Sequence, residues 1–71
     1  MTVREVLYIT DVCVVVQILD ESNDRSIGGT APYIMINAPY IMDRKVARIS
    51  IGNDRFEGPA IILMLVKEED V

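Results

Sequence analysis

The sequence predicts a small α+β domain: an N-terminal helix plus about four antiparallel strands in two hairpins, joined by a short helical or turn segment. Three observations lead to this prediction. A helix-start pattern opens the chain, two apolar β-branched stretches are each followed by a polar turn, and a proline-containing word occurs twice between them. A chain of 71 residues has room for one domain, which we take to span residues 1–71.

The first predicted element is a short helix that begins after Thr2. Thr2 and Glu5 have the spacing of a capping box, in which the threonine oxygen accepts from a helical N–H and the glutamate reaches back to the cap. Val3, Val6 and Leu7 then share one face at helical spacing. This face would cover one side of the sheet.

A strand is expected next, from Val12 to Asp20, because β-branched residues dominate this stretch. Its side chains are apolar on both faces, with Gln17 as the polar exception. A strand of this kind is central in its sheet and covered on both sides. A polar turn over residues 21–26 and a return strand over residues 27–30 complete the first hairpin, with Gly28 and Gly29 as a hinge or bulge.

The word Ala-Pro-Tyr-Ile-Met occurs at residues 31–35 and again at 38–42. Each copy follows a residue that can cap a helix, Thr30 or Asn37, and places proline early, where its missing N–H is tolerated. Two short helical turns are one interpretation, and an edge strand for the first copy is the other; we favour the turns. In both cases Tyr33 and Tyr40 combine an apolar ring with a polar hydroxyl, which suits the rim of an interface.

The second hairpin is expected between Val46 and Val66. Residues 46–51 alternate between apolar and polar, residues 52–58 form a turn, and residues 60–66 are apolar throughout, with Pro59 at the start of that strand. Both turns contain the word Asn-Asp-Arg, at 23–25 and 53–55. Two explanations stay open for this echo: a repeated hairpin unit, or the general preference of turns for Asn and Asp.

Composition limits how so small a domain can be stabilised. A chain of this length buries little more than ~60% of its unfolded surface, and small domains often add disulfides, metals or partner chains. Cys13 is the single cysteine and histidine is absent, so an internal disulfide and a zinc-type ligand set are excluded. We expect no cofactor and predict a homo-oligomer, a dimer or higher, that buries the sheet face left open by one short helix.

The net charge of −4 argues against binding of nucleic acid through bulk charge. The longest apolar run, residues 60–66, is too short to span a membrane, and no secretory signal opens the sequence. Together with the free cysteine, these features predict a cytoplasmic protein without a membrane partner.

No reaction is identified by the sequence. Without histidine, acid–base chemistry would fall to Asp, Glu, Tyr or Lys, and no spacing pairs them, so we predict no catalytic residue and no metal ligand. Cys13 lies among valines and is expected to be a buried, inert thiol. A magnesium-dependent nuclease acting through Asp11, Asp20 or Asp24 stays open as an alternative.

Four segments follow one another in a definite order: "TVREVL", "VCVVVQILDES", "GGT", and "APYIMDRKVARIS" before a turn and a final apolar strand. In this order and spacing the chain resembles short uncharacterised proteins of phages and prophages in Gram-positive bacteria. The resemblance is strongest at Pro39-Tyr40, Asp43-Arg44-Lys45-Val46 and Ile49. The doubled word, which is the repeated Ala-Pro-Tyr-Ile-Met segment, departs from the pattern. The resemblance implies a phage accessory protein; some genes of this kind encode inhibitors of host defence, including anti-CRISPR proteins.

Three functions are consistent with these observations. The leading hypothesis is a binding module, more a binding protein than an enzyme, that inhibits a host factor by occlusion through Tyr33, Tyr40 and Arg44. The second is an oligomeric nucleic-acid-binding protein whose basic residues gather on assembly; these are Arg25, Arg44, Lys45, Arg48 and Arg55. The third is the nuclease.

Overall fold

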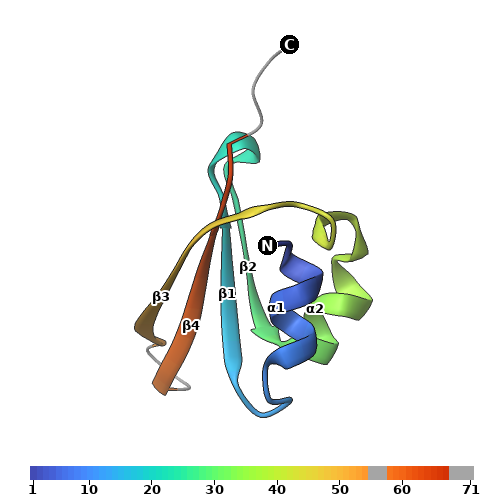
Figure 1. The fold of residues 1–71 in the computed structure, drawn as a ribbon. Helices are drawn as coiled ribbons and strands as arrows, with labels where there is room; N and C mark the ends of the chain where they lie inside the picture. Colours follow the sequence, from blue (N-terminus) through green and yellow to red (C-terminus); the bar gives the residue numbers. More distant parts are fainter. Residues whose placement is uncertain (55–57, 68–71) are drawn as a thin grey trace.

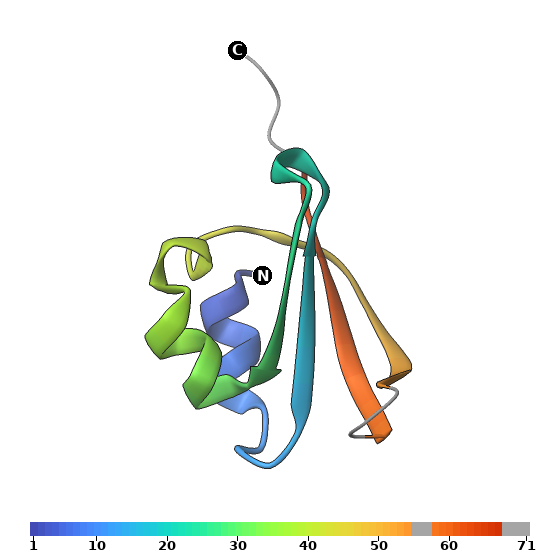
Figure 2. The same cartoon turned by 180° about the vertical axis from the view of Figure 1, so that it is seen from behind.

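The computed structural model describes residues 1–54 and 58–67. Its elements are α1 (Val3–Ile9), β1 (Val15–Asp20), the 3-10 turn η1 (Glu21–Asn23), β2 (Arg25–Thr30), α2 (Ala31–Asn37), the 3-10 turn η2 (Pro39–Ile41), β3 (Val46–Asp54) and β4 (Gly58–Leu65). Within the described residues, both helices lie on the same side of a four-stranded sheet (Figures 1 and 2). The predicted α+β class with an N-terminal helix is confirmed.

The strands of the sheet follow the order β2-β1-β4-β3. Each hairpin is antiparallel as predicted, but β1 and β4 pair in parallel at the centre. The expectation of an entirely antiparallel sheet is therefore wrong there. The path of the chain gives the reason: residues 31–45 cross over the helical side and carry β3 to the far edge, so β4 returns beside β1 in the same direction (Figure 1).

Helix α1 begins as its capping box predicts. The Glu5 N–H donates to Thr2 Oγ1 at 3.3 Å, and the Thr2 N–H donates to Glu5 Oε1 at 3.0 Å. The hydrogen bond from the Thr2 backbone, followed by that from its hydroxyl, holds the pKa of Glu5 below its ordinary value. Val3, Val6 and Leu7 are buried, so the predicted apolar face is the one that packs on the sheet.

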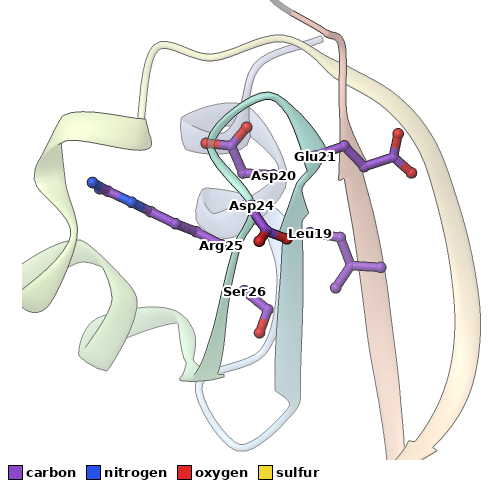
Figure 3. A pocket seen from close by; sticks show the side chains of 6 residues that line it. All are labelled: Leu19, Asp20, Glu21, Asp24, Arg25 and Ser26. Atoms are coloured by element: carbon purple, nitrogen blue, oxygen red, sulfur yellow. The ribbon is translucent and has the colours of Figure 1, made fainter.

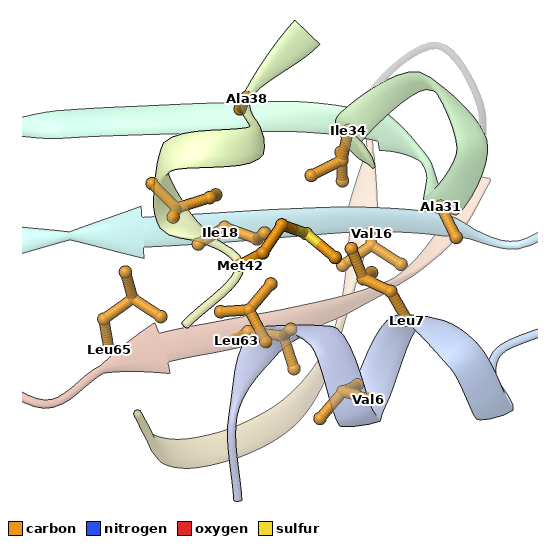
Figure 4. Close-up of a cluster of buried hydrophobic side chains, with 12 residues drawn as sticks. Val6, Leu7, Val16, Ile18, Ala31, Ile34, Ala38, Met42, Leu63 and Leu65 are labelled. Atoms are coloured by element: carbon orange, nitrogen blue, oxygen red, sulfur yellow. The ribbon is translucent and has the colours of Figure 1, made fainter. Parts of the chain in front are cut away.

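The core lies between the helices and one face of the sheet (Figure 4). Central strands, helices and the connection after α2 all contribute to it; its buried side chains are Val3, Val6, Leu7, Val16, Ile18, Ala31, Ile34, Ala38, Ile41, Met42, Leu63 and Leu65. The helices do not cover β3, where Ile49 is 49% exposed and Ile51 is 84% exposed. The core is therefore built on β1 and β4.

The two copies of Ala-Pro-Tyr-Ile-Met form two short helical turns, the interpretation that we favoured. In both copies the alanine and isoleucine are buried, and the proline and tyrosine are exposed. The first copy opens α2 with Thr30 at the N-cap position, and the second forms η2. The expected cap at Asn37 is wrong: Ala38 takes that position, and Asn37 Nδ2 donates to the Tyr33 carbonyl at 2.8 Å.

The first strand begins at Val15, later than predicted, because residues 12–14 form a turn. The Cys13 N–H donates to Asp11 Oδ1 at 2.9 Å, which directs the chain away from strand geometry. Cys13 is consequently exposed, and the expectation of a buried thiol is wrong. Gly28 and Gly29 lie inside β2 and form no hinge. Residues 55–57 of the predicted second turn, and with them the end of the second Asn-Asp-Arg word, lie outside the described residues.

No described helix lies on the other face of the sheet, which we term the open face (Figure 1). The strand register places three rows of residues on it: Thr30–Val15–Ala60–Gly52, Gly28–Gln17–Ile62–Ser50 and Ser26–Leu19–Met64–Arg48. The middle of each row is apolar apart from Gln17, and the ends are small or polar. β1 is central, as predicted, and the described helices cover it on one side. Cover of its other side stays a prediction.

Candidate partner-binding surface

Arg44 holds together the ends of two strands. Its Nη1 and Nη2 donate to the two carboxylate oxygens of Asp20 at 3.1 and 3.2 Å, and Nη2 also donates to the Val66 carbonyl at 3.1 Å. Asp20 is 6% exposed and also accepts from Asn23 Nδ2 at 2.9 Å. Burial raises the pKa of the Asp20 carboxyl, but the hydrogen bonds from Asn23 and Arg44 outweigh it and keep the pKa below its ordinary value. The Arg44 side chain, 17% exposed, therefore has a structural role.

Tyr33 and Tyr40 lie against alternate residues of the edge strand β2. The Tyr33 ring lies on Gly29: a Cβ added to that glycine would be 2.6 Å from Tyr33 Cδ1. The Cζ atom of Arg25 is 5.9 Å from the centroid of the Tyr40 ring, within the range of a cation–π contact. Because alternate residues of a strand share a face, Gly29 and Arg25 both point to the helical side. The doubled word thus places one tyrosine near each end of β2.

These side chains form an exposed group, which we term the tyrosine surface: Arg25, Tyr33, Ile36 and Tyr40. Tyr33 is 53% exposed and Tyr40 60%, and Ile36, one helical turn after Tyr33, is 78% exposed. Tyrosine and arginine are enriched where proteins bind one another. The contacts with Gly29 and Arg25 also limit how far the rings can move, which lowers the entropic cost of binding.

A hollow lies beside the tyrosine surface at the free edge of β2. It has a volume of about 340 Å³ and is lined by Gly28, Gly29, Thr30 and Tyr33. Since β2 stands at one end of the strand order, one side of its backbone has no neighbouring strand in the described chain. Unpaired N–H and C=O groups along such an edge can pair with another chain. Sequence reasoning missed this site because it interpreted the two glycines as a hinge.

A second hollow, of about 280 Å³, lies at the turn after β1 and includes Asp20 and Asp24 among its lining residues (Figure 3). Asp20 is engaged by Arg44, and Asp11 lies before β1, at the opposite end of that strand. In residues 1–54 and 58–67, no group of three or more His, Cys, Asp or Glu side chains is placed to hold a metal ion. The structure therefore does not bring together the three aspartates of the nuclease hypothesis.

The remaining basic candidates lie apart from Arg25. Lys45 precedes β3 and Arg48 lies on it, at the edge of the sheet opposite β2. Three strand spacings separate β2 from β3, which corresponds to about 14 Å. Arg44 is held in its ion pair, and Arg55 lies outside the described residues. A nucleic-acid site would therefore need several chains to assemble, which is what the nucleic-acid hypothesis assumes.

The tyrosine surface and the open face lie on opposite sides of the sheet. We expected the tyrosines at the rim of an interface formed by the uncovered face, or at a partner site beside it. Tyr33 belongs to α2 and Tyr40 to η2, both on the helical side, so they do not form the rim of the open face (Figure 2). The chain consequently presents two separate surfaces. One is an apolar sheet face and the other is an aromatic rim with a cation.

Comparison of the chain with protein-family models, with curated proteins and with solved structures finds no match in any of the three. None of the helices in the described ranges combines the length and apolar character needed to cross a bilayer. The function must therefore be inferred from the chemistry of the surfaces.

Proposed function

We propose that this chain is a phage-type accessory protein that binds a host protein through the tyrosine surface and inhibits it by occlusion. The phage-type assignment rests on the sequence resemblance, and the binding role rests on the surface itself. The protein acts in the cytoplasm of the host cell, as a binding protein without a cofactor.

The observation that carries the binding role is the placement of two exposed tyrosine rings along one strand, with an arginine against one of them. Tyr33, Ile36 and Tyr40 are each more than half exposed, and Arg25 lies against one of the rings. Aromatic side chains with arginine dominate the energetic centres of protein interfaces. This composition favours a protein partner over a small substrate.

We also propose that the chain forms a homo-oligomer through the open face. Val15, Leu19, Ile62 and Met64 form its apolar centre, framed by the small and polar residues of the edge strands. Burial of this centre against a second copy would leave the tyrosine surfaces free, because they lie on the other side of each sheet. An oligomer would then present several binding surfaces at once, which raises its avidity for a multivalent partner.

Capture from a lysate of a Gram-positive host tests the binding role. Tagged wild-type protein, the double variant Tyr33→Ala/Tyr40→Ala and the control variant Tyr8→Ala are compared. Tyr8 is 71% exposed on α1, outside the tyrosine surface, so its loss should not matter. We expect one partner to be retained by wild type and control and lost by the double variant, with unchanged circular dichroism in all three. Equal capture by all three proteins would contradict the proposal.

A plasmid assay separates the other two hypotheses. It measures DNA binding and nicking with and without magnesium over a series of salt concentrations. Binding that weakens steeply with salt would support the nucleic-acid hypothesis, because counterion release makes phosphate contacts salt-dependent. Magnesium-dependent nicking would support the nuclease. We expect neither.

A further inference from the structure

We propose that the partner is bound as an extended segment that pairs with the free edge of β2 and places an acidic side chain on Arg25 and an apolar side chain on Tyr33. This inference rests on the proposed binding function. It adds how the partner is held and what chemistry its segment must have.

The two edges of the sheet differ in their readiness to accept another strand. The pairing of β3 shifts register between Val46 and Arg48, and irregularity and charge at an edge hinder further pairing. The pairing of β2 with β1 is continuous from Arg25 to Thr30. In an antiparallel strand every second residue turns its N–H and C=O away from its neighbour. The edge of β2 therefore offers donors and acceptors along its length.

The middle of β2 also has little to obstruct a new strand. Gly28 is exposed, and neither Gly28 nor Gly29 has a side chain. A residue of an added strand opposite Gly29 would have its Cβ about 5 Å from the place that a Cβ of Gly29 would take, on the same face of the sheet. That position lies at the hollow lined by Gly28, Gly29, Thr30 and Tyr33, so its side chain would meet the Tyr33 ring. Tyr33, with Ile36 one turn away, favours an apolar side chain at this place.

At the other end of β2, Arg25 would bind a negatively charged side chain of the partner. Arg25 is exposed, and Figure 3 shows its side chain directed away from those of Asp24 and Glu21. The contact described for its guanidinium group is with the Tyr40 ring, which leaves N–H donors for a carboxylate. Charge complementarity therefore selects Asp or Glu opposite Arg25.

The spacing between the two contacts defines the segment. Arg25 and Gly29 are four residues apart, about 13 Å along a strand. An added strand has the same repeat, so its apolar and acidic residues must also be four positions apart and on one face. The partner segment is thus extended, with an apolar residue at one position and Asp or Glu four residues before or after it, depending on strand direction.

Two blocked heptapeptides probe this inference, Thr-Leu-Thr-Val-Thr-Glu-Thr and its reverse, added to the ¹⁵N-labelled full chain. We expect one of them to bind saturably and to shift the amide resonances of β2 while those of β3 stay in place. Analogues N-methylated on alternate amides form the decisive pair. One methylation pattern blocks the edge that faces β2 and should abolish binding, whereas the other blocks the outer edge and should leave binding intact.

Charge is tested by replacing the peptide's Glu with Gln. This change should weaken binding to wild type roughly fivefold. It should make no difference to the Arg25→Gln protein, whereas the control variant Arg48→Gln, altered on the opposite edge, should discriminate as wild type does. Tyr33→Ala should weaken binding of the Glu peptide and of the Gln peptide by the same factor.

Four results would overturn the inference: no saturable binding of either heptapeptide at millimolar concentration, shifts confined to β3 or the open face, equal loss with both methylation patterns, or occupation of β2 by a second copy. The last would appear as β2 shifts that depend on protein concentration without peptide.

If the capture from lysate still depends on Tyr33 and Tyr40, the binding function stands and the strand-pairing mode fails. If the peptides bind and capture does not depend on the tyrosines, the strand-pairing mode stands and the proposed binding function through the tyrosine surface fails.

Discussion

Among the described residues, the variant Arg44→Met removes two hydrogen bonds to the Asp20 carboxylate and one to the Val66 carbonyl. Methionine retains much of the aliphatic length of arginine, so the loss of packing is small. The Asp20 carboxylate, 6% exposed, would keep its hydrogen bond from Asn23 but lose its counter-charge. The variant therefore removes the ion pair together with the hydrogen bond to Val66.

The expected loss in the free energy of unfolding is about 3 kcal/mol at pH 7. Removal of one partner from a buried ion pair costs about 3–5 kcal/mol, because a desolvated charge is left behind. The side chain of Arg44 is 17% exposed, so water can compensate in part, and the lower end of that range applies. A domain of this size has a stability of only about 5 kcal/mol, so the variant should be folded but close to its limit.

Urea unfolding followed by circular dichroism measures this loss, with Arg4→Met as the matched control. Arg4 pairs with Asp43, but their side chains are 47% and 82% exposed, so this pair should contribute less than about 0.5 kcal/mol. The pKa of Asp20 is lower in the folded state. Its contribution is therefore complete above the unfolded pKa and lost as pH falls through the folded pKa, so the stability difference between wild type and Arg44→Met should narrow as pH falls through this range.

The reasoning would be refuted by a loss below about 1 kcal/mol at pH 7, well under the cost of an uncompensated buried charge. A loss equally large in Arg4→Met would show that burial does not distinguish the two pairs. A loss that keeps the same size as pH falls through the acidic range would show that the Asp20 charge is not its cause.

Three further predictions concern other parts of the fold. Gly29→Ala should cost about 1–3 kcal/mol, because its Cβ would clash with a tyrosine ring and because Gly29 has a φ of +153°, which L side chains rarely adopt. Gly28→Ala, with no atom nearer than 3.7 Å, should barely move the urea midpoint, and equal effects of the two changes would contradict both causes. Thr2→Ala should cost about 1 kcal/mol in the same assay and raise the pKa of Glu5 towards its ordinary value in an NMR titration, since the hydroxyl contact is lost; an unchanged titration would show that this contact does not lower the pKa. Met64→Lys should leave the circular dichroism unchanged but dissociate the homo-oligomer that we propose, as measured by sedimentation at micromolar concentration; a wild-type monomer of 8.0 kDa would contradict self-association.

The elements that the sequence predicts correctly are those with local signals. The capping box at Thr2 and Glu5, the alternation along the strands and the early prolines of the doubled word each involve residues close in sequence. Short-range hydrogen bonds and side-chain periodicity determine such elements. The start of β1 was predicted too early because valine density suggests a strand, while the Asp11 side chain makes residues 12–14 turn.

The features that were missed depend on contacts between distant residues. Arg44 was assigned to a partner site, but Asp20, 24 positions away, engages it, and no local pattern shows that pairing. The parallel centre of the sheet likewise follows from the path of the whole chain. The candidate site was predicted in part: both tyrosines are exposed, yet their contacts with Arg25 and Gly29 could not be seen before β2 was placed beside them.

The parallel pairing of β1 with β4 has a kinetic consequence. It joins Val15 to Ala60 and the residues that follow each of them, so the central contacts close a loop that spans most of the chain. Closing this loop lowers the conformational entropy of the chain before the stabilising contacts have formed, and this slows folding. The core also requires Leu63 and Leu65, close to the end of the described chain. Synthesis must therefore have passed Leu65 before this core can form, and until then β1 offers an unpaired edge to any neighbouring strand.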